Sequence, residues 1–108
     1  MPNPKHDRLA EQVQELRISF EMALSNKRKY PRGDFEAYYA AARRYIEALG
    51  QDPLIHRNVV NEISGLTEYL AVERKRVPEE VLWKAERLEC LCFAGYDPHF
   101  DGSEPPGL

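Results

Sequence analysis

Histidine and cysteine are the residue types of this sequence best suited to catalysis or metal binding, and neither follows a catalytic or metal-binding pattern. None of His6, His56 and His99 follows a glutamate by three residues, the spacing used by di-metal carboxylate sites in helical bundles. Cys90 and Cys92 are too close together to form a disulfide framework and lack the Cys-x-x-Cys spacing. The sequence therefore predicts no metal, cofactor or catalytic residue, with His56 a packed histidine and both cysteines reduced.

The densest chemical feature is a set of basic residues at the ends of two predicted helices. Seven of the fifteen Lys and Arg residues belong to it: Lys27, Arg28, Lys29, Arg32, Arg74, Lys75 and Arg76. In an up-down bundle these helix ends share one pole, where a nucleic acid or another polyanion could bind. Alternatively, the cations only stabilise the negative ends of the helix dipoles, and nearby acidic residues neutralise them: Asp34, Glu36, Glu79 and Glu80. The formal net charge of −3 argues against general nucleic-acid binding.

Apolar residues on the outer faces of two predicted helices form a second feature. At about 100° per residue, Trp83 and Cys90 lie opposite the inward stripe of their helix, with Phe93 beside them. Ala37 and Ala41 form a face of small residues on another helix. Tryptophan commonly anchors protein interfaces, so these residues predict binding to another protein or to a second copy of the chain. The alternative is that the C-terminal tail or a bent helix covers Trp83.

A third hypothesis is a small helical enzyme that acts on an anionic small molecule. Arg43 or Arg44 would then point into a polar pocket beside Tyr38 and Tyr45, because guanidinium groups bind carboxylates and phosphates well. Arginines at such positions more often form a solvated helix edge. The sequence therefore favours a protein without catalytic activity.

Prolines and glycines divide the chain into the elements that must position these side chains. Pro31, Pro53 and Pro78 fall between apolar-periodic stretches and never within one. The pattern predicts helices at about residues 4–29, 34–49, 53–76 and 78–94. Asp34 and Asp52 are expected to cap helix N-termini, and Gly50 is expected to end the second helix.

Each predicted helix has one apolar stripe with intervals of three and four residues. The first two stripes are Leu9, Val13, Leu16, Phe20 and Ala23, and Phe35, Tyr39, Ala42, Ile46 and Leu49. The last two are Ile55, Val59, Ile63, Leu66 and Leu70, and Val81, Ala85, Leu88 and Cys92. Gly65 is a point where the third helix is expected to bend or break, since glycine costs about 1 kcal/mol relative to alanine inside a helix.

Four amphipathic helices with short links predict an all-α, single-domain, up-down four-helix bundle over residues 1–95. Residues 96–108, rich in proline, glycine and acidic groups, are expected to form a non-helical tail or strap. No apolar run resembles a membrane span or a signal peptide, so a cytosolic location is expected. The sequence thus favours a small helical interaction module, self-associating or bound to another protein, over polyanion binding.

Overall fold

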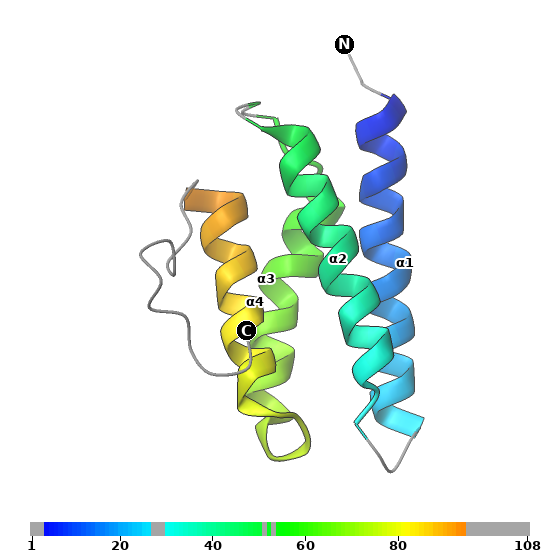
Figure 1. The fold of residues 1–108 in the computed structure, drawn as a ribbon, viewed down its shortest axis with the longest axis vertical. Helices are drawn as coiled ribbons and strands as arrows, with labels where there is room; N and C mark the ends of the chain where they lie inside the picture. Colours follow the sequence, from blue (N-terminus) through cyan, green and yellow to red (C-terminus); the bar gives the residue numbers. More distant parts are fainter. Residues whose placement is uncertain (1–3, 27–29, 51, 53, 95–108) are drawn as a thin grey trace. The chain divides into compact units, whose positions relative to one another are not determined.

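The structure of the protein is a computed structural model that describes residues 4–26, 30–50, 52 and 54–94. These residues form four α-helices and no strand (Figure 1): α1 (Pro4–Asn26), α2 (Arg32–Leu49), α3 (Arg57–Val72) and α4 (Glu79–Glu89). A 3-10 turn, η1 (Arg74–Arg76), follows α3, and a π-helical turn, η2 (Cys90–Ala94), continues α4. The predicted all-α fold with four helices is confirmed. The predicted tail at residues 96–108 lies outside the described residues.

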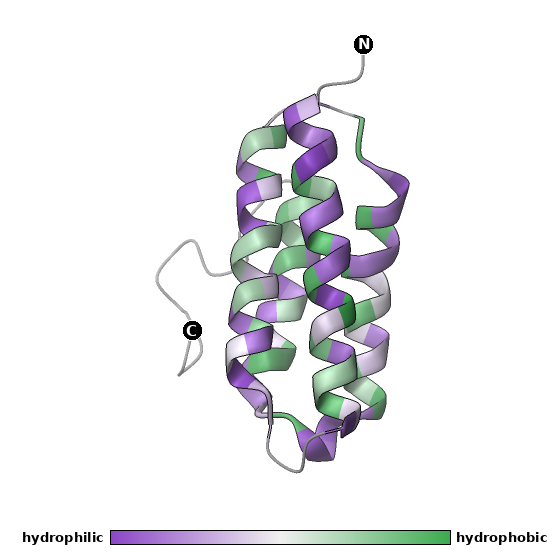
Figure 2. Cartoon of the chain, turned by 90° about the vertical axis from the view of Figure 1, so that its right-hand side faces the viewer, coloured by the Kyte–Doolittle hydropathy of each residue, from purple (hydrophilic) through white to green (hydrophobic). Residues whose placement is uncertain are grey.

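The chain forms two compact units, residues 1–62 and residues 63–108. In the first unit α1 packs against α2, and the two helices run in opposite directions (Figure 1). In the second unit the end of α3 leads through η1 into α4, which returns in the opposite direction. Hydrophobic and hydrophilic residues alternate along the helices (Figure 2), as expected where one face of each is buried. None of the described helices is long and apolar enough to cross a membrane.

Backbone contacts, rather than a side-chain cap, start α2. Pro31 precedes the helix, and its carbonyl oxygen accepts a hydrogen bond from the Phe35 N–H at 3.2 Å. The predicted cap at Asp34 is wrong, because α2 begins two residues earlier and Asp34 lies within its first turn. The Asp34 carboxylate there suits the positive end of the helix dipole. Gly50 follows α2 as predicted, with a φ of 59° and an N–H that donates to the Ile46 carbonyl at 3.1 Å.

The predicted helix cap at Asp52 is wrong, because α3 begins later than predicted and Asp52 makes only a local turn. Its Oδ1 accepts a hydrogen bond from the Leu54 N–H at 2.9 Å. Residues 54–56 are nevertheless not helical, so α3 begins at Arg57. The helix does not break at Gly65, since α3 runs through that residue without interruption. Burial of the apolar residues on either side offsets the low helix propensity of glycine.

The buried stripes of the first unit differ from the predicted ones. In α1 the buried residues are Ala10, Val13, Arg17, Phe20 and Leu24, and in α2 they are Phe35, Tyr38, Ala41, Ala42, Tyr45 and Leu49. Five predicted stripe residues are half-buried instead: Leu9, Leu16, Ala23, Tyr39 and Ile46. In both α1 and α2, apolar residues occupy two adjacent faces, so the sequence pattern alone does not determine which of the two is buried. The edge-on contact of Phe20 with Phe35, whose ring centroids are 5.4 Å apart, belongs to the face that is buried.

The buried side chains of residues 63–94 agree more closely with the sequence pattern. They are all apolar: Ile63, Leu66, Leu70, Val77, Val81, Ala85 and Leu88. The predicted stripe member Cys92 is half-buried. Val77 is extended, with φ of −126° and ψ of 147°, as expected for a residue that precedes a proline.

Candidate functional site

A hydrogen-bonded trio of side chains joins α1, α2 and the segment before α3. His56 Nε2 lies 2.6 Å from Asp7 Oδ1, and His56 Nδ1 lies 2.9 Å from the Tyr45 hydroxyl. The His56 backbone N–H also donates to the Tyr45 hydroxyl, at 3.0 Å. One arrangement of protons satisfies all three contacts: His56 Nε2–H donates to Asp7, and the Tyr45 hydroxyl donates to Nδ1. The two hydrogen bonds of the ring hold His56 between α1 and α2.

The trio has the order of carboxylate, imidazole and hydroxyl that nucleophilic catalysis uses, but its hydroxyl is enclosed. Tyr45 is 0% exposed, whereas the side chains of His56 and Asp7 are 29% and 50% exposed. A nucleophile must reach its substrate, so this geometry suits a structural tether better than a catalytic group. His56 is the packed histidine that the sequence predicts. It links the segment before α3 to Tyr45 on α2, 11 residues away, and to Asp7 on α1, 49 residues away.

A buried arginine makes a second polar tie in the same unit. Arg17 lies on the buried face of α1 and is 9% exposed. Its guanidinium donates to Glu21 Oε1 at 2.8 Å, and to both Oε2 and the backbone carbonyl of Glu62 at 3.2 Å. Charge-assisted hydrogen bonds from both terminal nitrogens to two carboxylates offset part of the desolvation of the guanidinium, whose Nε is buried without a partner. The Arg17 cluster therefore links the middle of α1 to the first turns of α3.

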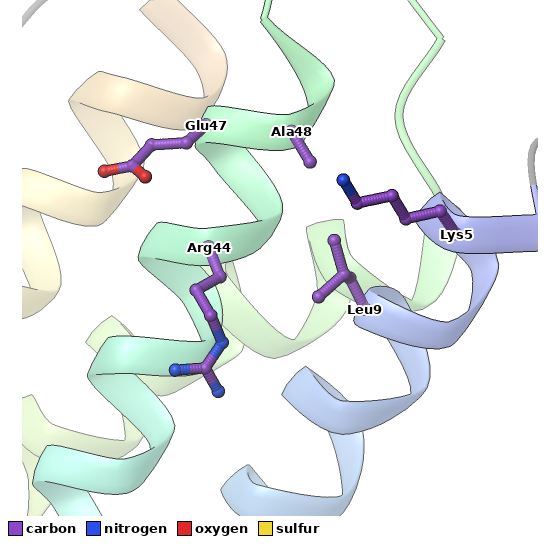
Figure 3. Close-up of a pocket in the computed structure, with 5 residues that line it drawn as sticks. All are labelled: Lys5, Leu9, Arg44, Glu47 and Ala48. Carbon is purple, nitrogen blue, oxygen red and sulfur yellow. The ribbon is translucent and has the colours of Figure 1, made fainter.

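A pocket of about 360 Å³ opens between α1 and α2 within the first unit (Figure 3). Its lining residues are Lys5, Leu9, Arg44, Glu47 and Ala48. Arg44 thus borders a pocket, as the enzyme hypothesis required, but Tyr38 and Tyr45 are fully buried and do not line it. Arg43 donates instead to the Tyr39 hydroxyl at 3.3 Å, with its guanidinium carbon 5.9 Å from the centroid of that ring.

The predicted partner-binding residues differ in exposure. Phe93 is 43% exposed on η2, and Trp83 and Cys90 are half-buried on α4 and η2. Ala37 is exposed on α2. The prediction that Ala41 lies on an outer face is wrong, because Ala41 is 0% exposed. The buried face of α2 passes through Ala41 since the aromatic residues three before and four after it are turned inward.

The two cysteines are free thiols. Cys92 lies on the side of the helix predicted to face inward, and burial raises its pKa from 9.0 to about 11. A thiol with this pKa stays protonated near neutral pH, and the thiolate is the reactive form. Cys92 therefore has the properties of a packed apolar side chain.

The predicted polyanion-binding residues belong to both units, and three of them are not described by the structure. Lys27, Arg28 and Lys29 lie outside the described residues. Arg32 is exposed in the first unit, with its guanidinium carbon 6.0 Å from the centroid of the Tyr30 ring. Arg74, Lys75 and Arg76 are exposed on η1 in the second unit, where Arg76 pairs with Glu73 at 3.2 Å. Binding of a polyanion by the combined set stays a prediction.

Sequence reasoning missed the residues that tie the first unit together. Asp7 lies 49 residues from its partner His56, and no local pattern links the two. Arg17 did leave a signal, because it falls three or four residues from apolar neighbours on the buried side of α1. Within the described residues, no group of three or more His, Cys, Asp or Glu side chains could hold a metal ion.

Comparison with known proteins adds no relative. No family model matches the sequence, and no significant match was found among curated proteins or solved structures. Function is therefore argued from the geometry of the two units themselves.

Proposed function

We propose that this protein is a small helical interaction module that pairs with a second copy of itself through one face of α4. The observation that carries the proposal is a set of residues named here the α4 outer stripe: Trp83, Glu86, Arg87 and Cys90. None of the four is buried. They lie on the opposite side of the helix from its three buried residues, Val81, Ala85 and Leu88.

The α4 outer stripe is complementary to itself when two copies meet in opposite directions. A two-fold axis between Glu86 and Arg87 sets Trp83 of one copy against Cys90 of the other. Glu86 and Arg87 lie about 100° apart around the helix and flank the line from Trp83 to Cys90 on opposite sides. The Trp83 ring and the Cys90 side chain then meet at both ends of the stripe, which favours this register over a shifted one.

Trp83 has the properties of an interface anchor. Its ring is half-buried, so part of its apolar surface faces solvent in the single chain. Tryptophan and arginine dominate the binding energy of many interfaces, because large flat groups lose much solvent contact for little conformational entropy. Both cysteines are free thiols, which suits the proposed place of action in the reducing cytosol.

The test is sedimentation equilibrium of the full chain under reducing conditions, from about 10 µM to about 1 mM. We expect a reversible dimer. Trp83→Ala should weaken the dimer by at least about tenfold, as expected for loss of an anchor. Cys90→Glu should weaken it by a similar factor, because a charged group then faces the Trp83 ring of the other copy.

Arg74→Glu is the matched control, because it reverses one exposed positive charge outside the α4 outer stripe. It should leave the dissociation constant within about threefold of the parent value. Circular dichroism of each variant checks that it is folded. A parent chain that stays monomeric throughout the range, or a folded Trp83→Ala variant that dimerises as tightly as the parent, contradicts the proposal.

A further inference from the structure

The pocket between α1 and α2 combines positive charge with an apolar floor. Lys5 and Leu9 come from the first turns of α1, whereas Arg44 and Ala48 come from the last turns of α2. Antiparallel packing brings these two helix ends side by side (Figure 1). The volume of about 360 Å³ lies within the range of small-molecule sites.

The side chains around the pocket are arranged by charge. Figure 3 shows the Lys5 ammonium extending toward Ala48, with Leu9 between it and the Arg44 side chain. The Glu47 carboxylate points away from the other lining residues. Leu9 and Ala48 are half-buried, and both Lys5 and Arg44 are exposed. Two cations thus border an apolar patch, while the acidic side chain of the lining is turned outward.

Arg44 differs from its neighbour Arg43 in the hydrogen-bond partners of its guanidinium. Arg43 donates to Tyr39 and lies over the ring of that tyrosine. Arg44 makes no hydrogen bond or ion pair with any residue that the structure describes. A ligand can therefore bind Arg44 without first breaking an internal contact. A guanidinium can bind a carboxylate through two parallel hydrogen bonds.

We propose that this pocket binds a small organic anion: a carboxylate with an apolar body. The Arg44 guanidinium would bind the carboxylate, the apolar body would cover Leu9 and Ala48, and the exposed Lys5 ammonium would add positive charge on the far side of the pocket. This site is separate from the α4 outer stripe, since all its residues belong to the first unit and the stripe belongs to the second. The two proposals can therefore fail independently.

The experiment is a titration of the isotopically labelled full chain with benzoate, followed by ¹H–¹⁵N NMR. Benzamide, which has the same ring and no charge, is the matched ligand. Benzoate should shift the amide signals of residues 5–9 and 44–48 in a saturable way, whereas benzamide should shift them little. Raising the ionic strength tenfold should weaken benzoate binding, because both cations are exposed.

Substitution of the two adjacent arginines tests the assignment directly. Arg44→Gln should raise the dissociation constant for benzoate by at least about tenfold, while Arg43→Gln leaves it within about twofold. Lys5→Met should give a smaller loss than Arg44→Gln, since an ammonium offers a point charge rather than a paired donor. Shifts that never saturate, equal binding of benzamide, or equal effects of the two arginine variants would each overturn the proposal.

Discussion

Helix α1 carries a buried arginine, whereas the buried side chains of residues 63–94 are all apolar. In the first unit, Arg17 and His56 connect segments that lie more than 40 residues apart through directional hydrogen bonds. Such bonds fix one register, because sliding one helix would leave charged or polar groups unsatisfied. Apolar burial in the second unit is not directional and tolerates small shifts more easily. The first unit is therefore specified by polar contacts and the second chiefly by apolar burial.

The same contrast separates the two proposed binding surfaces. The first unit uses Arg17 internally and leaves Arg44 at the edge of a pocket. The second unit keeps its charged residues off the buried face, so that α4 presents Glu86 and Arg87 beside Trp83. Charge in the first unit thus fixes the fold and offers an anion site. On α4, the charged side chains lie beside Trp83 on the side away from the buried residues.

Arg17→Ala should have the largest effect on this contrast. Removing the guanidinium leaves the Glu62 carboxylate, whose side chain is 16% exposed, without its cation. We expect the free energy of unfolding to fall by about 3–5 kcal/mol, as is typical when one partner of a buried ion pair is removed. Urea denaturation measures the loss, and amide hydrogen exchange should place it mainly in residues 4–62.

Arg43→Ala provides the comparison for Arg17. It also removes an arginine side chain, but the hydrogen bond that is lost, 3.3 Å long, joins Arg43 to Tyr39 within the same helix. The expected loss is below about 1 kcal/mol. If the two alanine variants unfold at the same urea concentration, polar contacts do not specify the first unit.

His56→Ala should have an intermediate effect. The change removes both ring hydrogen bonds and takes away the acceptor of the fully buried Tyr45 hydroxyl. We expect a loss of about 2 kcal/mol, because a buried polar group then loses a partner. A thermal melt measures it. The double variant His56→Ala, Tyr45→Phe should be more stable than the sum of the single losses predicts, and simple additivity would contradict a coupled trio.

The smallest expected effect is on the pH dependence of stability, through Cys92 in the second unit. Burial raises the Cys92 pKa to about 11 in the folded chain, against 9.0 for an unperturbed thiol. The neutral thiol is thus favoured by folding, and its contribution to stability is complete below pH 9 and declines as the pH rises toward 11. Cys92→Ala should remove this part of the pH dependence, whereas Cys90→Ala should retain it.

Thiol reactivity checks the same group kinetically. The Cys90→Ala variant leaves Cys92 as the one thiol to follow. At pH 8 its reaction with iodoacetamide should be at least about tenfold slower in the folded chain than in the urea-unfolded chain. Equal rates in the two states would show that the thiol is not shielded. In that case the inward position of Cys92 would not hold.

Local sequence signals predicted the helices of this protein because each signal acts over a few residues. Gly50 follows α2 with a positive φ, at the place where the sequence predicts the helix to end. The apolar stripe of α4 correctly identifies Val81, Ala85 and Leu88 as buried. These outcomes depend on backbone conformation and helical periodicity, which a short window of sequence contains.

The pairing of helices decided what local patterns left open. Ala41 belongs to the buried face and Ala37 to the exposed one, because the packing of α2 turns Tyr38 and Tyr45 inward. The sequence by itself determined which segments are helical and that each has an apolar side. Only the tertiary structure decided which edge of that side is buried, that His56 meets Asp7, and that Lys5 and Arg44 border one pocket. These contacts join residues about 40 or more positions apart, and their energy depends on distances in space that helical periodicity does not encode.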